Sequence, residues 1–415
     1  MGLEAVRILV HDYSGHPFQM QLSRALAARR HEVLHVHCAS YQTGKGAVTR
    51  TDDDPDTLRI EAIQLGQTFD RYSIGRRLGQ ELEYGGRFNR WAGAVRPDVI
   101  LSSNDPLFAK ARAAAWCARS RTPWVFWLQD VYSQAMAKYL GHRFGFAGPA
   151  LGWFFGGIER SLLRHAAAVV AITDDFRPML RSWGVPDQRC HVVENWAPLD
   201  ELRPLPKDNA WARRHGLHDR LVFLYSGTLG LKHDPGLLVA LAERFRADDR
   251  VRVVVVSEGR GRDWLAAETA ARPLANLLLL PYQPYEQVPE MLGTADVLLA
   301  LLEPDAGIFS VPSKVLTYLC AQRPIVAAMP RSNLATRTVE RAGAGVVVDP
   351  GNRDRFIAAA EAFVGDADLR RSAGERARQY AERSFDIDAI TDRFEDILAR
   401  AARTNGSDGS RGTRA

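Results

Sequence analysis

Residues 303–324 include the residue types that could bind a phosphate group. They follow an apolar run, residues 295–302, whose composition predicts a buried strand. Pro312 predicts the start of a helix, because its missing N–H would have had no partner in a first turn. A loop leading into a helix start presents unpaired N–H groups that attract anions. The segment also supplies small residues, hydroxyl groups and a cation: Gly307, Ser310, Ser313 and Lys314.

These residues also have a purely structural reading. Ser310 and Ser313 could cap a helix over residues 312–322. Capping and anion binding use the same N–H groups, so the two roles are compatible. We expect Ser310, Ser313 and Lys314 to bind a ligand.

Polar residues follow two further predicted strands of the second half. Glu258 ends the run 251–259, and Tyr282 ends the run 276–282, with Pro281 and Gln283 beside it. Ligands of parallel sheets bind beyond the carboxyl ends of the strands. Glu258 and Tyr282 are therefore candidate ligand contacts, with a turn glutamate and a core tyrosine as the structural alternatives.

The first half has two candidate positions at strand ends. The sequence HDYSGHPF (11–18) joins the first strand to the first helix, and Gly15 permits close approach of the backbone to a ligand. His11 or His16 could face a binding site, although a lone histidine is more often structural. Asp130 ends the apolar run WVFWLQD, where a buried carboxylate would be costly unless it is paired or belongs to a site. Asp130 is the best candidate for a general base that activates an acceptor hydroxyl, and His16 is the second catalytic candidate.

Short β-rich runs alternate with amphipathic helices along the chain, as is typical of parallel α/β sheets. The predicted strands of the first half are 6–10, 32–38, 98–103, 124–130, 167–173 and 191–196. Its predicted helices are 17–30, 106–121, 152–165 and 174–183. The predicted strands of the second half are 221–227, 251–259, 276–282, 296–303, 324–329 and 344–350.

A segment rich in proline and charge, residues 197–210, separates the two patterns. We therefore expect an α/β protein with two doubly wound, Rossmann-like domains, 1–200 and 201–385, facing across a cleft. A last helix, 386–403, is expected to return to the first domain. The polar residues 404–415 are expected to form a disordered tail.

Composition narrows the functional classes. A net charge of +5 that is mostly due to arginine suits phosphate-bearing ligands or an anionic membrane surface. No nucleic-acid-binding motif is present, so nucleic acid is not an expected partner. The four cysteines are widely spaced, which argues against a zinc site or disulfide framework and fits a reducing cytoplasm. The first residues do not resemble a signal peptide, and no apolar run is long enough to predict a transmembrane helix.

Two segments mix aromatic residues with cations in a way that suits a membrane interface. They are residues 69–91 and 139–164. The alternative is that each is a helix packed on its own domain. We therefore expect a cytoplasmic protein, with peripheral contact with the inner face of the plasma membrane as one option.

Taken together, the motifs resemble those of retaining GT-B glycosyltransferases of family 4 (GT4). The shared features are the tandem α/β halves, YSGTLGLKHDP (225–235), the SEG turn at 257–259 and PSK…RPIVA (312–327). VVENWAPLDEL (192–202) and WLQDVY (127–132) resemble the colanic-acid and O-antigen, or L-fucosamine transferase-like, subgroup. The resemblance covers residues 6–403. It implies an acceptor site in the first domain and a nucleotide-sugar site in the second.

The resemblance also implies roles for single residues. Lys232 occupies the place where the family positions a cation against the donor diphosphate, with a solvated loop lysine as the alternative. Cations and backbone amides can stabilise the leaving diphosphate, and the family typically needs no bound metal. The chain departs from the family in three places. Thr228 stands where many members have arginine, and Phe309 and Thr317 stand where many have a pair of glutamates.

Because the carboxylate that usually binds the ribose is missing, Lys314 is the candidate replacement group. The sequence thus predicts a hexosyl or N-acetylhexosaminyl transferase. The expected donor is a UDP-linked sugar, and no metal cofactor is expected. Its expected acceptor is a lipid-linked or other glycan in the assembly of an exopolysaccharide or lipopolysaccharide. The alternatives are a soluble transferase acting on a small metabolite and a non-catalytic sugar-nucleotide-binding subunit.

Overall fold

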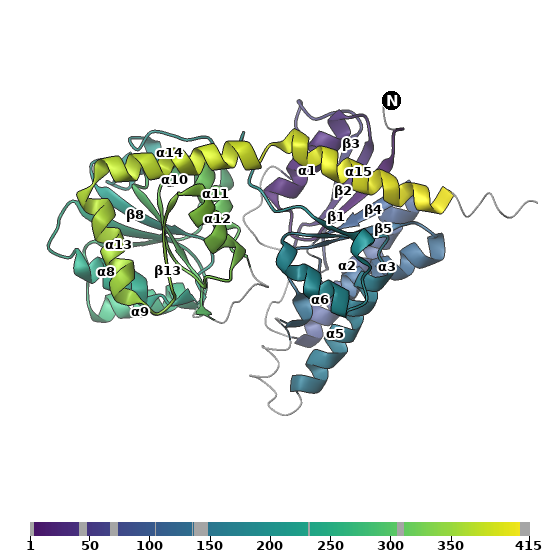
Figure 1. Cartoon of the computed structure of the whole chain (residues 1–415), viewed down its shortest axis with the longest axis horizontal. Helices are drawn as coiled ribbons and strands as arrows, with labels where there is room; N and C mark the ends of the chain where they lie inside the picture. The colour runs from purple at the N-terminus through teal and green to yellow at the C-terminus, as the bar shows by residue number, and fades with distance from the viewer. Residues whose placement is uncertain are drawn as a thin grey trace, which may run out of the picture. The chain divides into compact units, whose positions relative to one another are not determined.

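The computed structural model describes residues 4–40, 48–66, 74–103, 105–134, 136, 148–230, 233–304 and 311–406. The chain divides into two compact units (Figure 1). Unit 1 comprises residues 1–194 and 387–415, and unit 2 comprises residues 195–386. Each unit has a parallel sheet with helices packed against it.

Unit 1 contains a seven-stranded sheet in the order β3-β2-β1-β4-β5-β6-β7, and all of its pairings are parallel. The strands are β1 (Arg7–Asp12), β2 (Glu32–Cys38), β3 (Leu58–Ile63), β4 (Val99–Ser102), β5 (Trp124–Leu128), β6 (Ala168–Ala171) and β7 (Cys190–Val192). Helices cover both faces because parallel strands need crossover connections. The helices are α1 (Pro17–Ala28), α2 (Ile74–Val95), α3 (Leu107–Ser120), α5 (Gly148–His165), α6 (Arg177–Ser182) and α15 (Ile387–Gly406).

The C-terminal helix α15 belongs to unit 1, far in sequence from the rest of that unit. It packs on α1, β4 and β5. The ring of Phe394 lies 4.7 Å from that of Trp127, which is fully buried. Arg29 of α1 donates hydrogen bonds to Glu395 at 2.7 Å and to Asp392 at 2.5 Å. The aromatic contact and the pairing of Arg29 with two carboxylates therefore hold α15 on this sheet.

Unit 2 contains a six-stranded parallel sheet in the order β10-β9-β8-β11-β12-β13. The strands are β8 (Leu221–Ser226), β9 (Val251–Val256), β10 (Leu277–Leu280), β11 (Val297–Leu301), β12 (Ile325–Ala328) and β13 (Gly345–Val348). The helices are α7 (Ala210–Arg214), α8 (Gly236–Arg244), α9 (Arg260–Ala271), α10 (Val288–Thr294), α11 (Lys314–Cys320), α12 (Leu334–Ala342), α13 (Arg353–Gly365) and α14 (Ala367–Ser384).

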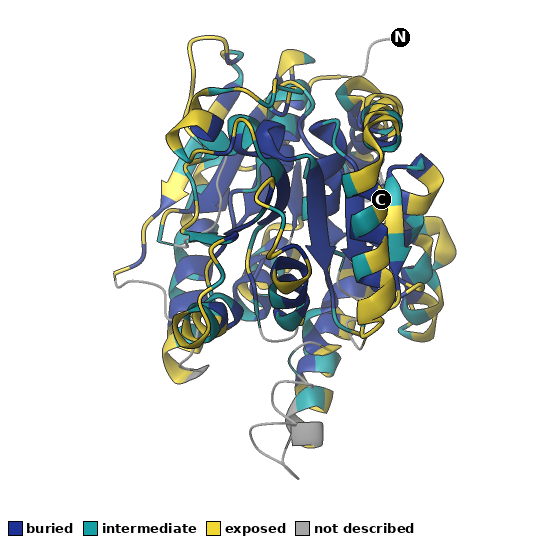
Figure 2. Ribbon diagram, turned by 90° about the vertical axis from the view of Figure 1, so that its left-hand side faces the viewer, coloured by how far each residue is buried: buried dark blue, intermediate teal, exposed yellow. Residues whose placement is uncertain are grey.

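The central strands are apolar along almost their whole length because both of their faces are covered. β9 reads VRVVVV and β11 reads VLLAL, and the valines and leucines in them are inaccessible to solvent or nearly so. Figure 2 shows the buried strands between helices whose outward faces are exposed. Polar side chains that could do chemistry are therefore confined to the strand ends and to the loops that follow.

The expected fold class, two Rossmann-like α/β domains with parallel sheets, is confirmed. β3, whose residues alternate between apolar and charged, was not among the predicted strands. Residues 74–95 form the helix α2, in which Tyr84 and Phe88 are fully buried. This burial supports the alternative that the segment is a helix packed on its own domain. None of the helices in the described residues is long and apolar enough to cross a membrane.

One glycine of unit 2 has no room for a side chain. A Cβ atom on Gly345, the first residue of β13, would lie 1.9 Å from the carbonyl oxygen of Ile325 on the neighbouring strand. We expect Gly345→Ala to lower the free energy of unfolding by about 3 kcal/mol, because the β12–β13 pairing must separate locally. Gly365→Ala is the matched control, since its Cβ would meet nothing within 4 Å, and we expect a change below about 1 kcal/mol. Equal stabilities in urea unfolding would contradict this packing.

Candidate functional site

The loops at the carboxyl end of the unit 2 sheet converge on the residues after β8. The Gly227 backbone has φ +122°, a conformation that favours glycine, and its N–H donates to the Val256 carbonyl at 3.0 Å. The Ser257 hydroxyl donates to the Gly227 carbonyl at 2.7 Å. The Leu229 N–H donates to the Glu258 carbonyl at 3.1 Å. The loop after β9 thus holds the loop after β8 in place.

A chain of tyrosine contacts brings the end of β10 to the same place. The Tyr282 hydroxyl lies 2.5 Å from the Thr228 hydroxyl, although β9 separates β10 from β8 in the sheet. The Tyr225 hydroxyl donates to the Thr228 carbonyl at 2.9 Å. Tyr282 is 37% exposed and is therefore not a core tyrosine, which was the structural alternative.

Lys314 reaches this loop from α11. Its Nζ lies 3.7 Å from the centre of the Tyr225 ring, and a Cβ atom on Gly227 would lie 3.2 Å from it. The Nζ is inaccessible to solvent and has no hydrogen-bond partner among the described residues. Burial lowers the pKa of Lys314 from 10.5 to about 7, which corresponds to roughly 5 kcal/mol against the charged form. A desolvated cation–π contact returns about 2 kcal/mol or somewhat more, so the ammonium is only partly compensated.

The start of α11 differs from the prediction. The helix begins at Lys314 and has seven residues, and Pro312 lies in the turn before it, where its carbonyl accepts from the Val315 N–H at 3.2 Å. Ser313 is exposed and makes no side-chain capping bond, so the capping alternative is not supported for its hydroxyl. Lys232, Gly307 and Ser310 lie outside the described residues.

The remaining candidates of unit 2 have different environments. Glu258 is exposed at the end of β9, in the expected place. Pro281 is also exposed, whereas Gln283 turns away toward α7 and accepts from the Trp211 indole N–H at 3.0 Å. The structure thus brings Tyr282 and Lys314 to the loop after β8, while Glu258 contributes its backbone to that loop.

In unit 1, the loop between β1 and α1 is organised by Asp12. Its carboxylate accepts from the N–H groups of Gly15 at 3.0 Å and His16 at 2.7 Å. The His35 imidazole lies 3.5 Å from the same carboxylate and contacts the Ser23 hydroxyl at 2.8 Å. Burial alone would raise the pKa of Asp12, but the hydrogen bond with His35 and the nearby histidines outweigh it and lower the pKa. The positive φ of Gly15 (+72°) closes the loop.

His16 is half-buried at the N-terminus of α1, and burial lowers its pKa although Asp12 opposes the shift. It therefore lies between the end of β1 and the start of α1, as the sequence predicted. His11 does not, because it is fully buried within β1, with its ring 3.9 Å from that of Phe88. The expectation that His11 faces a binding site is wrong.

Behind this loop lies a buried polar network. Asp105 contacts the His11 imidazole at 3.0 Å and accepts from the Ser102 hydroxyl at 2.6 Å. Lys110 donates to the Ser103 carbonyl, and its Nζ lies 3.7 Å from the centre of the Phe126 ring. Burial raises the pKa of Asp105 and lowers that of Lys110, while their mutual attraction opposes both shifts.

Asp130 follows β5 and is exposed, so the prediction of a buried carboxylate at that strand end is wrong. Asp130 borders a small cavity that is also lined by Asp105, Lys110 and Glu159. Glu159 of α5 accepts from the N–H groups of Tyr132 at 3.0 Å and Ser133 at 2.9 Å, which fixes the turn after Asp130. An exposed carboxylate at this edge can still accept a proton from a bound hydroxyl group.

The sequence analysis did not single out Asp12, His35, Asp105, Lys110 or Glu159. For Asp12 a signal existed, since an aspartate three residues before a glycine is typical of a side chain that accepts from a turn N–H. The others carry no local signal, because their partners lie on other elements.

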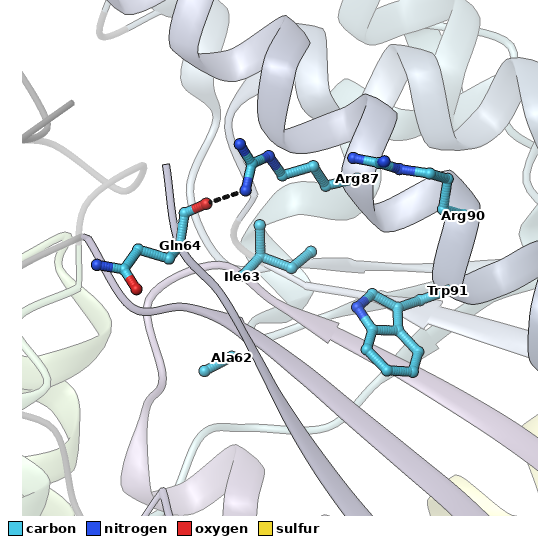
Figure 3. A pocket seen from close by; sticks show the side chains of 6 residues that line it. All are labelled: Ala62, Ile63, Gln64, Arg87, Arg90 and Trp91. Carbon is cyan, nitrogen blue, oxygen red and sulfur yellow. Dashed lines mark hydrogen bonds between the residues drawn. The ribbon is translucent and has the colours of Figure 1, made fainter. Parts of the chain in front are cut away.

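Two further cavities contain none of the predicted residues. One, of about 480 Å³, lies between the end of β3 and α2, and Figure 3 shows the Arg87, Arg90 and Trp91 side chains projecting from α2 toward it. Arg87 donates to the Gln64 carbonyl at 2.6 Å. Another, of about 1020 Å³, lies between α3 and α5 near the starts of β5 and β6, at the opposite sheet edge. The described part of the chain has no group of three or more His, Cys, Asp or Glu placed to hold a metal ion.

Comparison with known families agrees with the two-unit organisation. Residues 16–196 match the Glycosyl transferase 4-like domain, and residues 208–380 match Glycosyl transferases group 1. Together the matches span most of the chain, which belongs to the GT-B glycosyltransferases that these two domains define.

Individual relatives are more distant. The chain is 25% identical over 311 residues to an Escherichia coli K12 protein named "Putative colanic acid biosynthesis glycosyl transferase WcaI", covering 74% of each. Sucrose-phosphate synthase of Thermosynechococcus elongatus has the same fold (TM-score 0.72, 15% identity, 95% of this chain and 98% of that one). So does Anabaena Alr3699/HepE, solved in complex with UDP and glucose (TM-score 0.71, 17% identity, 95% and 100%).

The Asp12 contacts lead to a stability prediction. Asp12→Ala leaves two partly buried N–H groups without their acceptor, so we expect the free energy of unfolding to fall by about 2 to 4 kcal/mol. Asp12→Asn keeps one acceptor oxygen and should cost less. Because the folded pKa lies below the unfolded value of 3.8, the carboxylate's contribution is complete above that pH and disappears as pH falls through the folded pKa.

The measurement is urea unfolding of each variant between pH 3 and pH 7. Asp187→Asn is the control, since Asp187 pairs with Arg181 on the surface and should matter by less than about 1 kcal/mol. A pH-independent difference between wild type and Asp12→Asn would show that the carboxylate charge is not what holds the loop.

Proposed function

We propose that this glycosyltransferase is a retaining enzyme that transfers a hexosyl or N-acetylhexosaminyl group from a UDP-linked donor. Its acceptor is a lipid-linked or other glycan in the assembly of a cell-surface polysaccharide. The observation that carries the proposal is the convergence of the residues after β9 and β10 on residues 225–229 at the end of β8, with the buried Nζ of Lys314 beside them. Similarity to the colanic-acid protein supports the choice of acceptor, and the HepE complex with UDP supports the choice of nucleotide.

The chemistry requires a leaving group to depart with growing negative charge. In this proposal Lys232 and Lys314 stabilise the departing diphosphate, and neither step needs a metal. Ser313 and Tyr282 lie at the same sheet edge and contact the donor, together with Gly307 and Ser310 of the preceding loop. Glu258 contacts the sugar or the ribose from the end of β9.

The acceptor lies against the carboxyl end of the unit 1 sheet. Gly15 leaves space for the approach of the ligand, and His16 borders that space from the start of α1. Asp130 is the proposed base, because it is an exposed carboxylate at this edge in a turn fixed by Glu159.

An exposed aromatic pair supports a membrane-bound acceptor. Trp153 is 79% exposed and Phe154 is 51% exposed, more than any other large hydrophobic side chain in the described parts of the chain. They lie on α5 five to six residues before Glu159, or about 8 Å farther along the helix axis. Glu159 contacts the turn after Asp130, so the pair extends past the edge where the acceptor is proposed to bind. Aromatic side chains of this kind insert among lipid headgroups.

The proposed donor leads to a binding prediction. We expect UDP at about one hundred times its Kd to stabilise the protein by about 2.7 kcal/mol, which raises Tm by about 5 to 10 °C. Lys232→Ala should lower the rate of UDP-sugar consumption by about one hundredfold or more, as expected for loss of one charged contact to a leaving group. Arg355→Ala, which removes an exposed cation on α13, should leave both values unchanged. If no nucleoside diphosphate shifts Tm and no nucleotide-sugar is consumed, the proposed function is wrong.

The aromatic pair leads to a second prediction. The double variant Trp153→Ala/Phe154→Ala should bind vesicles of phosphatidylcholine and phosphatidylglycerol at least tenfold more weakly than wild type, because each buried aromatic contributes about 2 kcal/mol. Trp264→Ala is the matched control, an exposed tryptophan of unit 2. Vesicle co-sedimentation measures both, and equal binding by the double variant and wild type would exclude α5 as the membrane contact.

A further inference from the structure

Lys314 is an unusual lysine because its charge is buried without a counter-ion. The Nζ has neither solvent nor a hydrogen-bond partner among the residues that the structure describes. The Nζ lies 3.7 Å from the centre of the neutral Tyr225 ring, and a Cβ atom built on Gly227 would lie 3.2 Å from it. A buried ammonium is expensive unless it is paired, so a position of this kind suits a group that meets its partner only when a ligand binds.

Lys110 of unit 1 is also a buried lysine whose Nζ lies over an aromatic ring, and its charge is compensated by neighbouring groups. The Nζ atoms of both lysines lie 3.7 Å from the centre of a ring. Lys110 also donates to the Ser103 carbonyl and is attracted by the carboxylates of Asp105 and Glu159. Lys314 has no such contacts in the described residues, and burial is the cause of its lowered pKa.

The surroundings of Lys314 favour an anion as the missing partner. Gly227 has the positive φ of a loop that passes close to a ligand, and its missing side chain leaves the Nζ as the group nearest to that position. Tyr318 of α11 supports the same loop, because its hydroxyl donates to the Ser226 carbonyl at 3.1 Å and accepts from the Ser226 N–H at 2.9 Å. The loop is thus held rigidly beside the ammonium.

We propose that Lys314 binds a phosphoryl oxygen of the sugar-nucleotide and takes up a proton from solution as the donor binds. The inference rests on the proposed function and adds to it a donor contact that is linked to pH. The phosphoryl oxygen supplies the negative charge that the buried Nζ lacks, so binding favours the ammonium form. This step forms one N–H bond on Lys314 with a proton given up by the buffer acid, and no bond of the sugar-nucleotide is broken.

The described part of this edge has other ionisable groups. They are the hydroxyl groups of Tyr225, Tyr282 and Tyr318, the carboxylates of Glu258 and Glu303, and the imidazole of His233, whose Nδ1 accepts from the Gly230 N–H at 2.9 Å. Burial raises the pKa of Tyr225 and Tyr318 further above neutral pH. Proton uptake that is lost in Lys314→Met and kept in the Lys207→Met control therefore distinguishes Lys314 from His233.

The test is calorimetric titration with UDP-glucose in two buffers of different ionisation enthalpy. UDP-glucose is chosen because its diphosphate is a diester and lacks the phosphate proton that titrates near pH 6 in a monoester. With a free pKa of about 7, wild type should take up about 0.5 proton per donor at pH 7 and about 0.9 at pH 8. Its affinity should fall by nearly tenfold between pH 7.5 and pH 8.5.

Substitutions of Lys314 distinguish the role of its charge from a general effect on folding. Lys314→Met should take up no proton and bind UDP-glucose at least tenfold more weakly at pH 7. Lys314→Arg carries a permanent charge, so it should recover part of the affinity without proton uptake. Lys207→Met is the matched control, because Lys207 is the partly buried lysine at the opposite end of β8, where it pairs with Asp296. The control should show the same proton uptake as wild type.

Stability of the ligand-free protein gives a second readout. Lys314→Met removes a buried charge, so its Tm should exceed that of wild type by about 2 to 4 °C at pH 6.5. Because the folded pKa lies below the unfolded value of 10.5, this advantage should shrink as pH rises above 7. Proton uptake by Lys314→Met, or UDP-glucose binding by wild type without uptake, would overturn this inference alone. Absence of any donor binding by wild type would overturn it together with the proposed function.

Discussion

In each unit, all strands of the sheet run in the same direction, and this constraint decides where polar chemistry can occur. Parallel strands need helical crossovers, which cover both faces and leave the strands apolar. The polar residues then gather where the strands end. In unit 2 the ends of β8, β9 and β10 meet around Gly227 beside Lys314 of α11, and in unit 1 the ends of β1, β4 and β5 present Asp12, Asp105 and Asp130. Both proposed sites follow from this common edge.

Buried charges have different surroundings at the carboxyl ends of the two sheets. In unit 1 the charged groups are paired. Asp12 has two backbone N–H donors and His35, and Lys110 has a carbonyl oxygen and two carboxylates nearby. In unit 2 the Nζ of Lys314 has an aromatic ring but no hydrogen-bond partner among the described residues. An unpaired buried ion costs several kcal/mol, which a stable protein tolerates most readily at a site where a ligand supplies the opposite charge. This contrast supports the proposal that an anion binds in unit 2.

Much of the fold could be predicted from the sequence, because apolar runs of four to seven residues separated by amphipathic helices are a strong signal. β2 was predicted with its exact bounds, and most other predicted strands ran one to three residues beyond the observed ends. β3 was missed because it is an edge strand in which Arg59 and Glu61 interrupt the apolar residues. The sequence left two alternatives for α2, because aromatic residues and arginines occur together both at membrane surfaces and on helices that cover a sheet.

The candidate site could be predicted only in part. Strand ends can be located from sequence, and so Tyr282, Lys314 and Glu258 were found. The sequence could not predict that Lys314 is buried without a partner, because this depends on Tyr225 and Gly227, about 90 residues away. It also placed Asp130 inside the protein, although the apolar run stops being buried after Gln129. Contacts between distant elements decide these properties, and local patterns do not encode them.

The central claim is that the Lys314 ammonium lacks a partner until the donor arrives. A crystal structure of the protein with UDP-glucose tests it most directly. The account predicts a phosphoryl oxygen about 2.7 to 3.2 Å from the Lys314 Nζ, beside Gly227. A donor bound with its diphosphate away from Lys314, or a Lys314 that remains unpaired while the donor occupies the loop after β8, would contradict it.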